Sequence, residues 1–415
     1  MKRVGIAVLF LLLCPVVLAA QVERGICTIQ NAPAATLLVP YFEVDLAHAQ
    51  GADTLFTVNN ASNRGVIGHV TLWTDLSVPT LDFNVYLTGY DAVTFDLRDL
   101  FVSGLLPQTA SAGQDPADTI SPQGAFSQDV NFASCTGQLP LPPLPALFVT
   151  HLQNSHTGLG SPLFFNNCSG RALGDRVARG YLTVDVVSSC TLLFPTDVGY
   201  FSAGGTGAST NDNVLWGDVL YLDRRADTAR SGPVVTIEAS GGDPETSTAG
   251  GYTFYGRYTG WSAADNREPL GTNFGIRYRT VNRGATDLIV WRDSKVAQTP
   301  FACGNPPAAL GQEQIAAFDD EENPEVLGGT PFPVESQRVA VGGAALPVSF
   351  DSGWLFANLN RAGGGNPSED PAAAQGWVSS IVELGDRFTI GSEAVQLDSA
   401  CSANHRSIAS GGPLP

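Results

Sequence analysis

An aromatic stretch near the middle of the chain is the clearest candidate for ligand binding. Five aromatic side chains lie between residues 252 and 261, interleaved with Arg257 and glycines. Exposed aromatic rings can stack on sugar rings, and neighbouring polar side chains can hydrogen-bond the sugar hydroxyls. The candidate glycan-binding residues are Tyr255, Arg257, Tyr258, Trp261 and Asp265. The alternative, which we favour, is a strand and turn whose Tyr and Trp side chains pack at a seam between domains.

An acidic cluster further along the chain is a candidate metal site. Hard cations such as Ca²⁺ bind several oxygens at once, and a run of carboxylates can supply them. The candidate ligands are Asp319, Asp320, Glu321 and Glu322, which makes Ca²⁺ the one cofactor that the sequence suggests. The run lacks the alternating acidic spacing of the known calcium loop. A solvated acidic loop is therefore the favoured interpretation.

Paired carboxylates are the remaining candidates for catalysis. A hydrolase of this kind needs two carboxyl groups about 5 to 10 Å apart across a cleft, which sequence spacing cannot show. Asp75 and Asp293 stand at matching positions, two residues after Trp73 and Trp291. Equivalent placement favours a structural role such as capping a turn. We therefore predict no catalytic residue.

Motifs for other chemistries are missing from the sequence. It contains no Gly-x-Ser-x-Gly elbow, phosphate-binding loop, His-Glu-x-x-His motif or kinase signature. His151 and His156 lie five residues apart around an expected turn. Two histidines are too few for a metal site, so ordinary hydrogen-bonded histidines are the favoured interpretation.

The composition indicates which elements would hold these residues. Gly (45) and Pro (27) are abundant, 15% of residues are charged and 43% are hydrophobic. This much apolar material excludes disorder, and the shortage of charged residues disfavours long surface helices. The formal net charge of −18 disfavours a nucleic-acid partner. The sequence therefore predicts an all-β fold rich in turns.

Short runs rich in β-branched and aromatic residues predict the strands. The segment 92–97 alternates, with Val93, Phe95 and Leu97 on one face, which indicates a half-buried strand. No long helix is predicted, and residues 310–318 form at best a short one. The predicted strands are residues 54–58, 69–73, 83–87, 92–97, 147–152, 180–187, 214–222, 234–239, 274–280, 287–291, 354–359 and 377–383.

A repeated pattern predicts two related domains. Phe56 and Trp73 are 17 residues apart, as are Phe274 and Trp291, and each interval contains Asn-Arg-Gly. A Val-Thr/Ser-Phe-Asp segment follows in both copies, after an insertion of about 35 residues in the second. We interpret the pattern as a hairpin-based unit and predict two related antiparallel β-sandwich domains, immunoglobulin-like, with long loops. Chance similarity between short β motifs is the alternative.

A proline-rich segment sets the predicted domain boundaries. Prolines remove backbone donors and favour polyproline geometry, so residues 107–146 indicate a semi-rigid linker. The alternative is a long loop that covers a sheet edge. The predicted organisation is a signal peptide (1–20), a first β-sandwich (21–106), the linker (107–146), a larger second β-sandwich with insertions (147–405) and a flexible tail (406–415).

The N-terminus and the cysteines predict export. Lys2 and Arg3 precede an apolar run and a cleavable stretch of small residues, as in secretory signals. The six cysteines beyond that segment predict three disulfides, because exported chains pair an even number of thiols. Spacing alone cannot choose the connectivity; we predict Cys27–Cys401, Cys135–Cys168 and Cys190–Cys303.

Three segments carry a resemblance to a protein family. Residues 37–45 (LLVPYFEVD), 55–60 (LFTVNN) and 215–218 (LWGD) resemble motifs of a family of exported bacterial proteins with no known activity. The resemblance covers most of the mature chain. It implies a periplasmic or extracellular location and carries over no activity.

The expected function is that of a secreted, non-catalytic structural or interaction protein. Its partner would be a protein or a glycan at the cell surface, with no nucleic acid and no stable membrane anchor. Two alternatives stay open, an extracellular carbohydrate-binding protein and a carboxylate-dependent hydrolase. An exposed row of aromatic rings would favour the first, and a cleft lined by paired carboxylates would favour the second.

Overall fold

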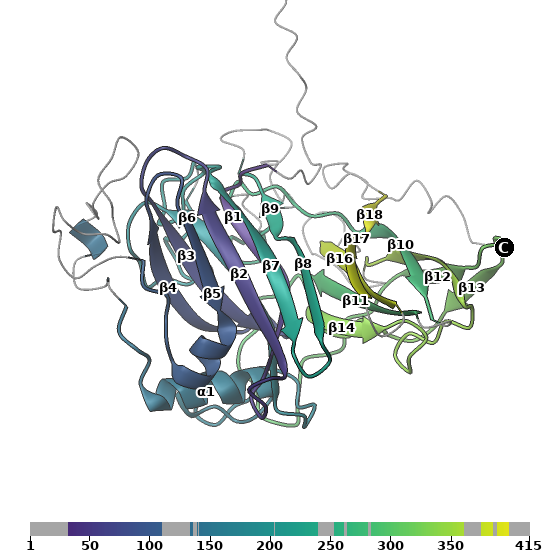
Figure 1. Cartoon of the computed structure of the whole chain (residues 1–415). Helices are drawn as coiled ribbons and strands as arrows, with labels where there is room; N and C mark the ends of the chain where they lie inside the picture. Colours follow the sequence, from purple (N-terminus) through teal and green to yellow (C-terminus); the bar gives the residue numbers. More distant parts are fainter. Residues whose placement is uncertain are drawn as a thin grey trace, which may run out of the picture.

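Antiparallel sheets make up most of the regular structure. The computed structural model describes residues 32–109, 133–135, 139, 141–202, 204–239, 253–260, 264–280, 284–360, 375–384 and 388–397. Their strands form four antiparallel sheets, which pack in pairs as two neighbouring β-sandwiches (Figure 1). The predicted all-β class with two antiparallel sandwiches is therefore confirmed.

The first sandwich takes its strands from the N-terminal half of the chain. One sheet has the strand order β4-β3-β6-β1-β9, and the other has the order β5-β2-β7-β8. The strands are β1 (Thr36–Asp45), β2 (Ala52–Asn60), β3 (Val66–Thr74), β4 (Pro79–Leu87), β5 (Ala92–Asp96), β6 (Val177–Val187), β7 (Leu215–Asp223), β8 (Thr228–Pro233) and β9 (Val235–Ile237).

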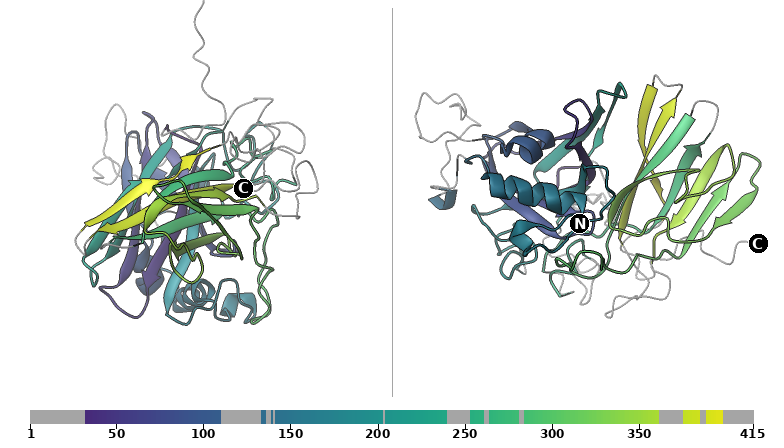
Figure 2. Two further views of the ribbon diagram at one scale, coloured as in Figure 1. Left: turned by 90° about the vertical axis from the view of Figure 1, so that its right-hand side faces the viewer. Right: turned by 90° about the horizontal axis from the view of Figure 1, so that it is seen from below.

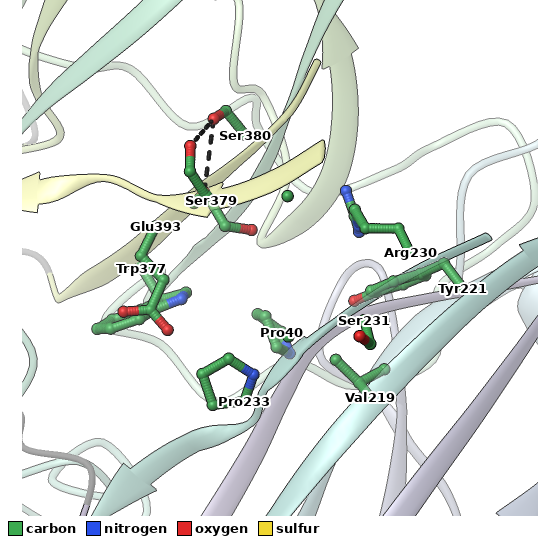
Figure 3. Close-up of a pocket in the computed structure, with 13 residues that line it drawn as sticks. Pro40, Val219, Tyr221, Arg230, Ser231, Pro233, Trp377, Ser379, Ser380 and Glu393 are labelled. Atoms are coloured by element: carbon green, nitrogen blue, oxygen red, sulfur yellow. Dashed lines mark hydrogen bonds between the residues drawn. The ribbon is translucent and has the colours of Figure 1, made fainter. Parts of the chain in front are cut away.

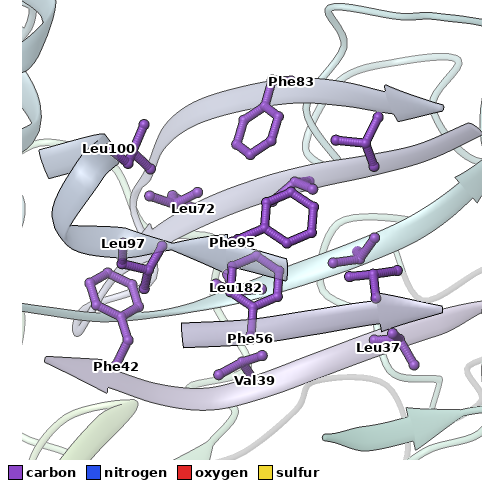
Figure 4. Packing of buried hydrophobic residues seen from close by; sticks show 14 of the residues in the cluster. Leu37, Val39, Phe42, Phe56, Leu72, Phe83, Phe95, Leu97, Leu100 and Leu182 are labelled. Atoms are coloured by element: carbon purple, nitrogen blue, oxygen red, sulfur yellow. The ribbon is translucent and has the colours of Figure 1, made fainter. Parts of the chain in front are cut away.

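The core between these sheets explains why the segments form strands. On β5, Phe95 is buried and Thr94 is exposed, as the alternation in the sequence predicts. Phe56 on β2 stacks on Phe95 with the ring centroids 4.3 Å apart. Figure 4 shows both rings among aliphatic side chains such as Leu72 and Leu182. Burial of one such side chain contributes about 1.5–3 kcal/mol, so period-two patterning fixes the sandwich.

The second sandwich has its own core, around Phe274, Leu288 and Leu355. Its sheets have the orders β13-β12-β15-β10-β18 and β14-β11-β16-β17. The strands are β10 (Asn273–Arg279), β11 (Gly284–Arg292), β12 (Gln314–Phe318), β13 (Pro324–Leu327), β14 (Ser336–Ala340), β15 (Ser352–Asn358), β16 (Gly376–Leu384), β17 (Phe388–Glu393) and β18 (Val395–Gln396).

The strand pairing moves the boundary between the sandwiches. β6 lies between β3 and β1, and β7 pairs with β2. The first sandwich therefore continues to residue 237 and does not end at residue 106, and the second begins at β10 and not at residue 147. The proline-rich segment 107–146 connects two parts of one sandwich, and its Leu141 and Leu144 pack against the first core. The signal peptide (1–20) and the tail (406–415) lie outside the described residues.

One predicted strand is a helix. Residues 147–152 belong to α1 (Ala146–Thr157), which packs across one end of the first sandwich (Figure 2). α1 follows Pro145 and ends at Gly158, whose left-handed φ of 73° stops the helix. A short apolar run cannot separate strand from helix, and the short helix expected within 310–318 is instead β12. Short helical turns occupy Asp99–Ser103, Ala133–Cys135 and Pro162–Phe164.

The disulfide partners differ from those predicted. Cys135 is bonded to Cys190, and Cys168 is bonded to Cys303. The predicted pairs Cys135–Cys168 and Cys190–Cys303 are therefore wrong, because sequence spacing does not say which loops meet in space. The third predicted pair, Cys27–Cys401, lies outside the described residues. The Cys168–Cys303 bond ties the segment after α1 to the segment that follows β11.

The two copies of the repeated pattern occupy comparable strands. Phe56 and Trp73 lie on β2 and β3, and Phe274 and Trp291 lie on β10 and β11. In each copy the first strand belongs to one sheet and the second to the other. The unit therefore crosses between sheets and is not the predicted hairpin. The insertion carries the hairpin β12–β13, and residues 348–351 precede β15 instead of ending a strand.

Candidate functional site between the two sandwiches

The outer face of one sheet of the second sandwich packs against the first sandwich. Ile289 on β11 and Ile381 on β16 meet Tyr41 on β1 and Tyr221 on β7 in one apolar cluster. We call this contact, between the sheet β14-β11-β16-β17 and the first sandwich, the seam. It places residues that are far apart in the sequence within reach of one another.

Arg257 occupies the part of the seam where β11 ends and β14 begins. Its Nη1 donates hydrogen bonds of 2.8 and 2.7 Å to the two carboxylate oxygens of Glu335 and lies 3.2 Å from Asp293. Its Nη2 donates to the hydroxyls of Ser77 at 3.3 Å and Tyr181 at 3.2 Å. Residues of both sandwiches thus share one guanidinium.

The predicted glycan-binding residues lie in and around this cluster, inside the molecule. Tyr255 and Asp265 are buried, and Asp265 accepts a 2.9 Å hydrogen bond from the backbone N–H of Tyr255. Arg257 is buried as well, 4.7 Å over the ring of the partly buried Tyr258. Trp261 lies outside the described residues. The four described side chains do not form the exposed platform required for stacking on a sugar, and their packing matches the alternative, a seam between domains.

The electrostatics of the Arg257 cluster suit it to holding the sandwiches together. Burial raises the pKa of Glu335, and the charge of Arg257 opposes that shift. Glu335 and Asp293 are both buried, so neither carboxylate can readily exchange protons with a substrate and water. A buried ion pair of this kind is strongly destabilising when one partner is removed.

Asp75 and Asp293, the matched acids of the repeat, both have structural partners. Asp75 accepts a 2.7 Å hydrogen bond from Arg171, and its carbonyl oxygen accepts from the N–H of Glu335 at 3.1 Å. Asp293 accepts a 2.7 Å hydrogen bond from the N–H of Lys295, two residues on. The two acids therefore support turns beside the seam, in keeping with the structural interpretation.

The acidic run forms the turn between β12 and β13. Asp319 accepts hydrogen bonds from the N–H groups of Glu321 at 3.0 Å and Asn323 at 2.8 Å. Within the described ranges, no three His, Cys, Asp or Glu side chains are grouped so as to hold a metal ion. The structure therefore gives no support to the Ca²⁺ site predicted at Asp319, Asp320, Glu321 and Glu322, and the Asp319 carboxylate caps its own turn.

His151 and His156 are also structural. Both lie on α1 and not around a turn. His151 Nε2 lies 3.1 Å from the carbonyl oxygen of Thr80, and His156 Nε2 lies 2.8 Å from the hydroxyl of Thr80. Burial lowers the pKa of His156 to about 3, so this imidazole is neutral at physiological pH. The pair anchors α1 to the first sandwich.

A pocket of about 360 Å³ opens in a different part of the seam, where β8 meets β17 (Figure 3). The first sandwich contributes Pro40 and residues of β7 and β8. The second sandwich contributes Trp377, Ser379 and Glu393 from β16 and β17. Both sandwiches are needed to form the pocket, so it exists only in the assembled chain.

Strand pairing aims the polar side chains into the pocket. Tyr221 is opposite Arg230 in the β7–β8 pair, and Ser379 is opposite Glu393 in the β16–β17 pair. Directly opposed residues of an antiparallel pair point to the same face of the sheet. Figure 3 shows Arg230 and Tyr221 on one side of the pocket and Trp377 with Glu393 across from them.

Arg230 is the distinctive residue of the pocket. It is 8% exposed, and its Nη1 has no hydrogen-bond partner among the described residues. The guanidinium lies 4.3 Å over the ring of Tyr221, and a Cβ at Gly391 would come within 2.9 Å of the Arg230 side chain. Burial lowers the pKa of Arg230, but a guanidinium stays protonated in proteins. An unmet buried donor is costly, and an oxyanion would satisfy it.

The remaining polar groups of the pocket suit binding better than catalysis. Glu393 is the one carboxylate among the described lining residues, and partial burial raises its pKa. Several lining residues are serines, of which Ser380 and Ser392 share a 2.8 Å hydrogen bond. No His, Cys or second acid stands among the described lining residues. A two-carboxylate mechanism therefore lacks its second acid, and a serine nucleophile lacks a histidine to act as its base.

Sequence reasoning misses this pocket for a physical reason. It places Trp377 in a strand but predicts neither β8 nor β17, which carry Arg230 and Glu393. Both are short edge strands with little buried apolar surface. Edge strands often carry charged residues and proline, which prevent them from pairing with another strand. The Arg-Ser-Gly-Pro segment at 230–233 is an edge signal of this kind, but nothing in it indicates a ligand.

No family model, curated protein or solved structure matches this chain. Within the described ranges, no helix combines the length and the apolar composition needed to cross a membrane.

Proposed function

We propose that this chain is an exported, non-catalytic interaction protein whose ligand occupies the pocket between the two sandwiches. The observation that carries the proposal is the buried Arg230, whose Nη1 is unpaired among the described residues and which lines a cavity built by both sandwiches. A bound ligand would satisfy that donor and contact both halves of the chain.

Among the alternatives, the pocket favours carbohydrate binding over hydrolysis. Trp377 lines the pocket with Glu393 and several hydroxyls, and an aromatic ring with nearby polar groups is suited to a sugar. Hydrolysis by paired carboxylates is less well supported, because Glu393 has no acidic neighbour among the described lining residues.

Export is supported by the chemistry of the cysteines. Two disulfides join distant parts of the chain, and such bonds persist in oxidising compartments. The signal peptide and membership of an exported bacterial family stay predictions.

We also infer that the two sandwiches arose by duplication. β2 pairs with β5 and β3 lies between β4 and β6, while β10 pairs with β15 and β11 lies between β14 and β16. The same arrangement of five strands in each half supports the repeat, with β12–β13 as the insertion. The pairs β2–β5 and β3–β6 also match the centre of an immunoglobulin sandwich, but β1 pairs with β6 and β7 with β2, so the immunoglobulin-like relationship stays a prediction.

A ligand screen on the full chain tests the proposed function. The panel contains neutral and acidic oligosaccharides, amino acids and short peptides, and the readout is the melting temperature. At least one compound is expected to stabilise the parent and to lose its effect in Trp377→Ala, which removes a wall of the pocket. Trp354→Ala is the matched control, because Trp354 is partly exposed on the far sheet, stacked on Phe318.

Two outcomes would contradict the proposed function. One is that no compound of the panel stabilises the parent. The other is that the stabilising compounds act equally on Trp377→Ala. Release of new reducing ends from a panel sugar by the parent would favour the hydrolase instead.

A further inference from the structure

We propose that the pocket binds a hexuronic acid, a sugar that carries a carboxylate, as one residue of a glycan. The inference rests on the proposed function and names the chemical class of its ligand. The carboxylate lies at Arg230, and the ring and its hydroxyls face Trp377 and Glu393.

The Arg230 side of the pocket suits a planar oxyanion. The guanidinium is held by Tyr221 on its face and by Gly391 along its stem, so its N–H groups are presented in a fixed orientation. A guanidinium matches a carboxylate in geometry and forms charge-assisted hydrogen bonds with it. Such bonds are about twice as strong as neutral ones, and here they would also remove the cost of an unmet donor.

The other charges disfavour a more highly charged ligand. Glu393 lines the same pocket, and the chain has a formal net charge of −18. One guanidinium can neutralise a single negative charge, but a phosphate dianion would keep an uncompensated charge facing Glu393. A monoanionic carboxylate is therefore the anion that this pocket accommodates best.

The side of the pocket opposite Arg230 suits the rest of a sugar. Trp377 offers an apolar ring surface, and a sugar presents apolar C–H groups on the faces of its ring. Glu393 can accept hydrogen bonds from hydroxyls, and the Ser379 hydroxyl can both donate and accept. A volume of about 360 Å³ is near the lower end of small-molecule sites, which fits a short segment of glycan. Ser231 and Glu393 are exposed at the rim, so adjoining sugars can extend into solvent.

Calorimetric titration of the full chain tests the carboxylate directly, without altering the protein. The probes are trimers of galacturonic, glucuronic and mannuronic acid, the methyl ester of each trimer, and the matching neutral trimers. At least one acid trimer is expected to bind at least tenfold more tightly than its own methyl ester and its neutral counterpart. The inference is overturned if ester and acid bind equally, or if none of the acids binds.

Substitution of the arginine provides the second test. Arg230→Gln is expected to weaken binding of the acid trimer at least tenfold and to leave any binding of the ester unchanged. Arg225→Gln is the matched control, because Arg225 is an exposed arginine in the β7–β8 turn and does not line the pocket. Equal affinity of Arg230→Gln and parent for the acid would overturn the inference, and thermal melts establish that the variants fold.

The results separate this inference from the proposed function. Suppose that no uronic acid binds, but a neutral sugar or an amino acid binds the parent and not Trp377→Ala. The uronic-acid inference is then wrong and the pocket is still a ligand site. If no compound depends on Trp377, both fail.

Discussion

Two buried arginines lie at the same seam, and their surroundings differ. Arg257 donates to Glu335, Ser77 and Tyr181 and lies beside Asp293. Arg230 lies over Tyr221, and its Nη1 has no partner within the described ranges. Both guanidiniums lie close to an aromatic ring, so the difference lies in the acceptors.

The comparison assigns a structural role to Arg257 and a ligand-binding role to Arg230. Burying a charge is costly unless hydrogen bonds and opposite charges compensate for it. At Arg257 the chain supplies the compensation, and the cluster joins the sandwiches. At Arg230 the chain leaves a donor unmet beside a cavity, which is the arrangement expected where the compensation comes from a ligand.

Removal of the paired arginine is expected to have the largest effect on stability. Arg257→Met leaves Glu335 and Asp293 buried without their shared cation. Breaking a buried pair in this way costs about 3–5 kcal/mol of unfolding free energy, which urea unfolding measures. A loss below about 1 kcal/mol, the size of a surface ion pair, would contradict the structural role of the cluster.

The disulfide between the sandwiches ranks second. Cys168 is close in sequence to Arg171, which bonds Asp75, and Asp75 in turn bonds Glu335. The double substitution Cys168→Ser with Cys303→Ser opens a loop of sequence separation 135 and should cost about 2–4 kcal/mol. Since this bond lies on the Arg257 side of the seam, ligand affinity at Arg230 should stay unchanged. A loss of affinity as large as that of Arg230→Gln would show that the two parts of the seam are not independent.

The pH dependence of stability is expected to come partly from Glu335. Its folded pKa is raised above the unfolded value of 4.5, mainly by burial. The folded chain therefore binds more protons just above pH 4.5, and stability falls as the pH rises through that window. Glu335→Gln should flatten this fall, because the amide cannot take up the proton. Urea unfolding between pH 4.5 and 7 measures it, and an unchanged slope would refute the assignment.

Removal of Arg230 is expected to have the smallest effect on stability. Arg230→Met replaces a buried guanidinium, whose Nη1 has no acceptor among the described residues, with an apolar side chain of similar length. The unfolding free energy should change by less than about 1 kcal/mol, or rise, because no ion pair is broken. The same urea experiment measures it beside Arg257→Met. A loss comparable to that of Arg257→Met would mean that Arg230 is structural after all.

The fold could be predicted to a large extent, and the site could not. Val93, Phe95 and Leu97 follow a period of two, so this strand and the all-β class can be predicted from the sequence. The pairing partners of β6 and β7 cannot be predicted from the sequence, because contacts between distant segments decide which strands pair. The partners of Cys168 and Cys190 escape prediction for the same reason.

The candidate residues show where composition misleads. The aromatic stretch around Tyr255 has the residue types of a sugar platform, yet burial decides its role, and burial depends on the second sandwich. The acidic run at Asp319 has the residue types of a metal site, yet hydrogen bonds within its turn occupy the Asp319 carboxylate. Arg230 has no distinguishing neighbours in the sequence, and only the meeting of β8 with β17 gives it a role.

The contact between the edge strands β8 and β17 also affects how the two sheets can pair. β8 and β17 are edge strands of different sheets that lie against each other. Exposed edges are templates for pairing, and a bond between these two would fuse the sandwiches into one continuous sheet, open to further chains. Pro233 offers no N–H, and the stem of Arg230 occupies the space beside Gly391. Residues that line the pocket thus also separate the two edges, so a substitution made to change the ligand would act on the contact between the sandwiches as well.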